Sequence, residues 1–341
     1  MLFKFDHRKK SSNPVLSIFR LFLSLIILVV LSVGLLQAYK SFSGYDPMSL
    51  SPKASFESLM SSDSLYTFVI SLLSFSPDNP LTKDKILKNM GGVAGNEDVT
   101  PSGEVAFKFA VLADSHKDTG GLEKALLQAK NQGAAFIVMM GDLSDVGTME
   151  ELTAIKEKLD AGGIPYYVGA GDHDLWDSRD KGNSADNNFK TIFGSAYQSF
   201  SYDNVRYILI YNSDNYLGLD GVQLKWIEDE LERTKTDMPK RIFVFAPTPL
   251  FHPSSDHVMG KVTPKLKAQA EHLISIFKKS GVDQVFSADT HFFSNFIEPT
   301  NELKMTTVGA LTAEKNAQTP RFALVEIYSD GNYRVVETEV K

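Results

Sequence analysis

The sequence contains no cysteine, no internal repeat and no low-complexity array. A chain without thiols tolerates any redox compartment, so the absence of cysteine does not tell whether the protein lies inside or outside the cell. The chain also lacks an excess of positive charge, because its formal net charge is -7 at pH 7 and no basic stripe is evident. Nucleic-acid surfaces usually carry such stripes, so we do not expect nucleic acid as a partner.

An uncharged apolar segment near the N-terminus, Leu21 to Ala38, is about long enough to cross a bilayer. It follows a basic flank made of Lys4, Arg8, Lys9, Lys10 and Arg20. A cleavable signal sequence is the alternative, but its apolar region is normally only about 7 to 15 residues long and Leu36-Gln37-Ala38 is a poor cleavage site. We therefore expect a transmembrane helix over residues 21–39 that acts as a signal anchor. Positive charge keeps residues 1–20 cytoplasmic, which predicts a single-pass protein of the cell membrane with its C-terminal domain on the external side.

The rest of the chain divides into a linker and one large domain. Residues 40–104 are rich in Ser, Pro, Asn and Asp, and we expect a membrane-proximal linker with a short apolar helix near Leu65 to Phe75. That stretch is too short and too interrupted by serine to be a second span. Residues 105–341 suffice for one large α/β domain with a substantial core. The sequence carries no signal for the oligomeric state.

Three apolar runs in this domain read as strands covered on both faces, because they are continuous rather than alternating: Phe109 to Ala113, Ala134 to Met140 and Ile164 to Ala170. Helical patterns lie between them. The first helix is indicated by apolar residues at i, i+3, i+4, i+7, and Thr148 with Glu151 makes a capping box for the second. The order is therefore βαβαβ, and the carboxyl ends of such parallel strands lie at one edge of the sheet, where ligands bind.

A polar cluster follows each of these strands: Asp114-Ser115-His116, then Gly141 to Asp145, then Gly171 to Asp174. Carboxylates and imidazoles recurring at strand ends are what a two-metal site requires. An Asp after a strand is by itself more often a helix cap or a turn former. The joint occurrence of the clusters, in order and each at a strand end, favours the metal site.

These residues resemble the calcineurin-like metallophosphoesterases, whose pattern is D-x-H, G-D-x-x-D, G-N-H-D/E, H-x-P and G-H-x-H. The first two motifs match outright, and the third matches except that Asp172 stands in place of Asn. In the fourth motif Pro247 falls where His belongs, and in the fifth Asp289 replaces the first His while His291 supplies the second. The resemblance covers roughly residues 105 to 340. It implies an α/β fold, a four-layer α/β/β/α sandwich of two mixed sheets flanked by helices.

Further elements fit that fold. We expect helices at Val222 to Leu231 and Pro264 to Lys279, and strands at Val205 to Tyr211, Ile242 to Ala246, Val282 to Ser287, Lys304 to Val308 and Phe322 to Tyr328. The last strands should alternate, as in antiparallel pairing. The polar segments Asp177 to Phe189 and His252 to Val262 are predicted to be accessible, mobile loops that select the substrate.

The resemblance also implies roles for individual residues. Asp142 would bridge two metal ions, with Asp114, His116 and His291 completing the first site and Asp172 and Asp289 contributing to the second. His173 would stabilise the transition state or protonate the leaving group, and Asp174 would orient it. His252 is a further candidate, since a folded-back loop could return an imidazole to the second metal. His257, in a solvated loop, and His272, on the polar side of a helix, receive no role.

The altered ligands predict two divalent metal ions of different kinds. Two imidazoles suit Mn, Fe or Zn at the first site, whereas oxygen-only ligation favours Mn, Mg or Ca at the second. The four aspartates can also offset the formal charge of both ions, which would acidify water less and attract phosphate less. We therefore expect weaker activity than that of a full family member, or a shift to a single-metal or Mn²⁺-dependent enzyme.

Three functions are consistent with these residues. The first is a membrane-anchored, metal-dependent phosphoric ester hydrolase, a phosphatase or phosphodiesterase acting on an external phosphomonoester or phosphodiester. The second is a metal-binding, non-catalytic module that acts through partners, which the loss of two His ligands keeps open. The third, a nuclease, is least favoured because the sequence lacks a basic approach to the site.

Overall fold

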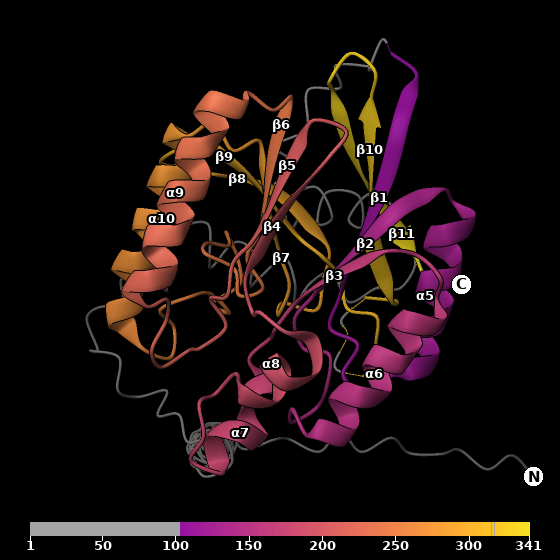
Figure 1. The fold of residues 1–341 in the computed structure, drawn as a ribbon, viewed down its shortest axis with the longest axis vertical. Helices are drawn as coiled ribbons and strands as arrows, with labels where there is room; N and C mark the ends of the chain where they lie inside the picture. Colours follow the sequence, from indigo (N-terminus) through magenta and orange to yellow (C-terminus); the bar gives the residue numbers. More distant parts are fainter. Residues whose placement is uncertain (1–102, 315, 317) are drawn as a thin grey trace, which may run out of the picture. The chain divides into compact units, whose positions relative to one another are not determined.

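The computed structural model describes residues 103–314, 316 and 318–341 (Figure 1). The predicted cytoplasmic N-terminus, the predicted membrane span at residues 21–39 and the linker up to residue 102 lie outside this range. Within the described residues, none of the helices has the length and apolar character needed to cross a bilayer.

The first sheet contains five strands in the order β11-β10-β1-β2-β3. Its centre is the predicted βαβαβ unit, in which β1, β2 and β3 are parallel and helices α5 and α6 connect them. At the other edge, β10 is antiparallel to both β1 and β11. The bounds are β1 Val105–Ala113, α5 Thr119–Asn131, β2 Ala134–Met140, α6 Met149–Ala161, β3 Tyr166–Gly169, β10 Arg321–Tyr328 and β11 Tyr333–Glu339.

The second sheet contains six strands in the order β4-β5-β6-β7-β9-β8. Strands β5, β6, β7 and β9 are parallel to one another, whereas the edge strand β4 is antiparallel to β5 and the edge strand β8 is antiparallel to β9. The bounds are β4 Gln198–Tyr202, β5 Val205–Leu209, α9 Gly221–Asp237, β6 Arg241–Phe245, α10 Lys267–Lys279, β7 Gln284–Ser287, β8 Ser294–Glu298 and β9 Leu303–Thr307. Both sheets are therefore mixed, as predicted.

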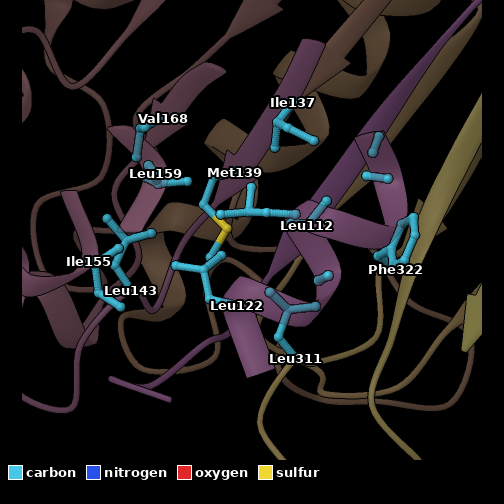
Figure 2. Packing of buried hydrophobic residues seen from close by; sticks show 14 of the residues in the cluster. Leu112, Leu122, Ile137, Met139, Leu143, Ile155, Leu159, Val168, Leu311 and Phe322 are labelled. Carbon is cyan, nitrogen blue, oxygen red and sulfur yellow. The ribbon is translucent and has the colours of Figure 1, made fainter. Parts of the chain in front are cut away.

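Three hydrophobic clusters hold the layers together. Along β1, side chains alternate between two of them: Phe109 and Val111 pack between the sheets against Phe243 and Phe245, whereas Leu112 packs toward α5. Figure 2 shows Leu112 beside Leu122 and Met139 in the cluster under α5 and α6. The third cluster lies between the second sheet and helices α9 and α10. In Figure 1 the two helix pairs accordingly flank the sheets from opposite sides, giving four layers.

Strand β10 differs from the prediction. It pairs antiparallel, as expected, but its side chains do not alternate, since Phe322 to Tyr328 are all buried. Because β10 is an inner strand, one face packs between the sheets through Ala323 and Val325 and the other packs toward the helices through Phe322 and Leu324. A strand covered on both faces reads as a continuous apolar run.

The prediction of a mobile loop over Asp177 to Phe189 is also wrong. The segment forms two short helices, α7 Trp176–Asp180 and α8 Asn187–Phe193, in which Ser178, Asn188 and Phe189 are buried. The amide of Asn188 donates to the carbonyl of Gly147 at 2.9 Å and to the carboxylate of Asp177 at 2.8 Å. The first bond ties the segment to the loop after β2, and the second joins α8 to α7.

Candidate metal centre

The site lies where the strands end, in loops with an unusual backbone. Positive φ angles occur at Asp114 (51°), His116 (41°), Asp142 (44°), Asp289 (64°) and His291 (57°). Left-handed conformation is uncommon outside glycine and costs about 1–3 kcal/mol per residue, so it persists only where the surrounding structure enforces it. Here the loops bond to one another: the backbone N–H of Asp114 donates to the carbonyl of Gly141 at 3.2 Å, and that of His116 to the carbonyl of Asp142 at 2.9 Å.

The structure brings the predicted first-site ligands together. Asp114, His116, Asp142 and His291 each offer an atom within 4.8 Å of all the others. The Nε2 atoms of His116 and His291 are 3.0 Å apart, and His116 Nε2 lies 3.8 Å from Asp142 Oδ2. These are separations that ligands of one ion adopt, because each donor lies about 2.0–2.2 Å from the metal.

Burial makes a cation at this cluster favourable. Asp114 is fully buried, and its Oδ2 atom has no hydrogen-bond partner among the described residues. Burial raises the pKa of Asp114 well above its usual value, and the Asp289 carboxylate adds to that effect. The pKa of Asp142 is raised first by burial and then by the charge of Asp172. A divalent cation would satisfy the orphaned oxygen and offset these crowded carboxylates, so the residues fit a metal ion.

The second half of the site is arranged differently from the expectation. Asp142, Asp172 and His173 form a second group, in which each residue offers one ligand atom and these atoms all lie within 4.8 Å of one another. Asp289 belongs to neither ligand group found in the described residues. Its backbone N–H donates to Asp114 Oδ1 at 3.2 Å, while its carboxylate Oδ1 lies 3.9 Å from Nδ1 of His257.

Pro247 offers no ligand and instead supports the backbone beneath the site. A Cβ atom added to Gly141 or Gly169 would lie 3.4 Å from the ring of Pro247. The proline therefore packs against the end of β3 and against the residue before Asp142. Its role is in packing.

His173 is held with one nitrogen free of the backbone. Its Nδ1 lies 2.7 Å from the carbonyl oxygen of Asp145, which can only accept, so Nδ1 carries the proton. The ring stacks on Trp176 at 3.9 Å between centroids and lies edge-on to His116 at 4.8 Å. Nε2 is consequently the atom that can accept a proton or face a substrate.

Asp174 does not orient His173, contrary to the role implied by the resemblance. Its carboxylate is fully buried and accepts from the backbone N–H groups of Leu143 at 3.3 Å, Ser144 at 3.0 Å and Gly171 at 2.9 Å. The Ser144 hydroxyl also donates to it at 2.7 Å. Burial raises the pKa of Asp174 to about 6, although its hydrogen bonds act in the opposite direction. Asp174 therefore joins the loop after Asp142 to the turn before Asp172.

His252 does not return to the metal centre. Its Nδ1 accepts from the backbone N–H groups of Ser254 at 3.1 Å and Ser255 at 2.8 Å, so Nε2 is protonated and donates to Ser294 Oγ at 2.9 Å. Both nitrogens are occupied within the loop and β8. Burial lowers the pKa of His252 to about 4.

The other two histidines without a predicted role differ from each other. His272 is exposed on α10, as predicted. His257 is also in an exposed loop, but its interaction with the Asp289 carboxylate raises its pKa, and the charge of Asp172 contributes. Sequence reasoning missed this neighbour, because only the folded loop brings residues 257 and 289 together.

Buried carboxylates and imidazoles at the strand ends of a two-sheet sandwich form the kind of centre that metal-dependent hydrolases use. A sequence model described as calcineurin-like phosphoesterase matches residues 107–293. The chain belongs to the calcineurin-like phosphoesterase family. No curated protein matches it.

Several solved structures resemble the fold. The purple acid phosphatase PPD1 from yellow lupin (Lupinus luteus) seeds has a TM-score of 0.55 and 14% identity, with 70% of this chain and 52% of that chain covered. GAP50, the anchor in the inner membrane complex of Plasmodium, has a TM-score of 0.44 and 17% identity over 70% of this chain and 90% of that chain. The protein TT1561 of Thermus thermophilus has a TM-score of 0.45 and 12% identity, covering 70% of this chain and 100% of that chain. The chain thus spans about half the length of the lupin phosphatase, and that likeness shows the fold.

Proposed function

We propose that this protein is a metal-dependent phosphoesterase that hydrolyses a phosphomonoester or a phosphodiester. The observation that carries the proposal is the buried cluster of Asp114, His116, Asp142 and His291, whose ligand atoms lie within 4.8 Å of one another. Family membership supports the same chemistry.

The first site would be held by these four residues, and its mixed imidazole and carboxylate donors suit Mn, Fe or Zn. The second would use Asp142 and Asp172, with Asp289 beside them, and its oxygen donors alone would favour Mn, Mg or Ca. When bound, the ions supply charge neutralisation for the phosphoryl group and acidify water.

The chain's own residues would position the substrate and deliver the proton. His173 is oriented by the Asp145 carbonyl, so in its doubly protonated form it would donate a proton from Nε2 to the leaving oxygen. The indole ring of Trp176 stacks on the His173 ring and so helps to hold its plane. On the other side of His116, Nδ1 lies 3.8 Å from Asp145 Oδ1, and Asp145 in turn pairs with Lys117.

We further propose that residues 21–39 anchor the protein in the cell membrane, with the phosphoesterase domain outside. The support is the uncharged apolar segment and its basic flank. Alkaline extraction of membranes and protease protection of intact cells test this. A soluble or protected domain would contradict it.

A non-catalytic, metal-binding module is the second candidate. It is favoured by Pro247, which packs against the backbone and offers no ligand, and by Asp289, which stands outside both ligand groups of the described residues. Both features weaken the second half of the centre.

Hydrolysis of an aryl phosphate and of an aryl phosphodiester during a Mn²⁺ titration separates the two candidates. We expect Mn²⁺-dependent turnover of at least one ester, lost in His291→Ala and retained in His272→Ala, a matched change of an exposed histidine. Bound metal without turnover of either ester would favour the non-catalytic module.

A further inference from the structure

We propose that Trp176 and Tyr216 form an aromatic platform that binds a planar aromatic leaving group, so that the substrate is a phosphoester whose alcohol carries an aromatic ring. This inference rests on the proposed function, because it concerns which esters the same centre accepts. It assigns a selective role to the loop after β5, residues 210–220, which lies outside every motif of the family pattern.

Trp176 lies beside the group that would protonate the leaving oxygen. Its indole ring stacks on the His173 ring, with 3.9 Å between centroids and 28° between planes, and the residue remains 36% exposed. His173 Nδ1 is engaged by the Asp145 carbonyl at 2.7 Å, so Nε2 is the atom left to meet a substrate. Because the alcohol part of an ester departs next to its proton donor, it would lie near the indole of Trp176.

A second aromatic ring reaches the centre through the loop after β5. The Asn215 side-chain amide donates to Asp172 Oδ2 at 3.2 Å, and the Ser213 hydroxyl donates to the carbonyl of Ala170 at 2.5 Å. These two bonds tie the loop to the end of β3 and to the turn that follows it. Tyr216 is therefore the residue next to one that contacts the metal centre directly.

Arg179 joins the two rings. It follows Trp176 by three residues in α7, so both side chains lie on one side of that short helix. The Arg179 guanidinium carbon lies 4.8 Å from the centroid of the Tyr216 ring, and its Nη2 lies 3.5 Å from Asp214 Oδ1. Asp214 Oδ1 also accepts from the backbone N–H groups of Tyr216 and Leu217, each at 3.0 Å. Helix α7 and the loop after β5 thus hold both rings at one rim of the centre.

The rings stay accessible although their anchors are buried. Tyr216 is 54% exposed, whereas Asp214 is only 5% exposed and Ser213 is fully buried. Aromatic side chains that are fixed and accessible beside a site suit stacking on a planar group, and this stacking tolerates different ring systems. A saturated alcohol has no π-face, so it would gain less from the platform.

Surface packing alone is the competing explanation, since single exposed aromatic residues are ordinary. Packing of this kind predicts no discrimination between substrates. An aromatic platform has to discriminate between esters that share the same leaving oxygen and differ in whether they carry a planar ring.

The test compares kcat/KM of the purified full chain, with Mn²⁺, for two matched pairs of primary-alcohol esters. Benzyl phosphate against cyclohexylmethyl phosphate reports an aryl ring, and adenosine 5′-monophosphate against ribose 5-phosphate reports a nucleobase. Each ester is supplied as the monoester and as its methyl diester. We expect the aromatic member to be preferred by at least about 5-fold in one or both pairs, the lower end of what stacking a base on an aromatic side chain contributes.

Variants assign that preference to the rings. Tyr216→Leu should reduce the preference toward equality, whereas Tyr216→Phe should keep it because the ring remains. The control Leu217→Ala changes an exposed neighbour in the same loop and should keep it as well. Trp176→Leu should lower the preference and also lower kcat for every ester, because the indole supports His173.

The outcomes separate this inference from the proposed function. Equal kcat/KM for both members of each pair in wild type would overturn the inference, and so would a preference that survives Tyr216→Leu. Either result leaves the proposed function in place, since esters are still hydrolysed. No turnover of any ester by the Mn²⁺-loaded wild type would overturn the proposed function and this inference with it.

Discussion

Replacing Asp174 tests whether this carboxylate holds the metal loops together or serves His173. Asp174 is fully buried and accepts three backbone N–H groups and one hydroxyl. In Asp174→Asn the side-chain oxygen can still accept from Ser144. The new NH₂ group then faces the backbone N–H groups of Leu143 and Gly171, which lose their acceptor. Each buried donor left unsatisfied costs about 1–3 kcal/mol, so we expect the two together to cost about 2–6 kcal/mol. That is a large part of the roughly 5–15 kcal/mol that stabilises a typical domain.

Urea unfolding of the wild type, Asp174→Asn and the exposed neighbour Asp180→Asn measures this loss. The control should stay within about 0.5 kcal/mol of wild type, because it changes an exposed side chain. Metal binding should weaken in Asp174→Asn together with stability, since the loops after Asp142 and before Asp172 lose their connection. A variant as stable as wild type but slower in turnover would refute the reasoning and restore the orienting role toward His173.

Three further predictions concern the metal and pH. A chelator should lower the melting temperature of the isolated protein, and added Mn²⁺ should restore it, because a ligand at 100 times its Kd stabilises the folded state by about 2.7 kcal/mol. Identical melting temperatures with and without Mn²⁺ would contradict a metal site. His291→Ala should lower Mn²⁺ affinity by at least about 100-fold in the same titration, being a direct ligand rather than a supporting group, and an unchanged affinity would remove it from the site. Burial lowers the pKa of His252 to about 4 in the folded protein, so the unfolded chain takes up the proton first and the free energy of unfolding falls as pH drops from about 6.5 toward 4. His252→Asn should flatten this dependence of the unfolding free energy on pH, measured by denaturation across the same range. Equal slopes in wild type and variant would count against burial of His252 as the cause.

The βαβαβ unit and the first-site cluster were predictable from the sequence because both depend on local signals. Continuous apolar runs mark β1, β2 and β3, and the spacing of Leu122, Ala125, Leu126 and Ala129 marks the buried face of α5. Parallel connection then brings the strand ends to one edge, so Asp114, Asp142 and their neighbours meet without further information.

The remaining features depend on long-range contacts that no local pattern encodes. Helix α8 is polar in sequence, yet Asn188 is buried because it bonds to Gly147, 41 residues away. Asp174 follows the family pattern, but its partners were readable only from the folded loops. His257 and Asp289 meet through the loop after β6, whose course is set by the bond between Met259 and Pro249.

The central claim is that the buried cluster at the strand ends is a metal centre that hydrolyses phosphate esters. The most direct test follows bound Mn²⁺ and aryl phosphoester hydrolysis in the same samples of wild type and Asp142→Asn. We predict that turnover rises in proportion to occupied sites in the wild type and that both are lost in the variant. Turnover that persists in metal-free protein, or in Asp142→Asn, would contradict the account.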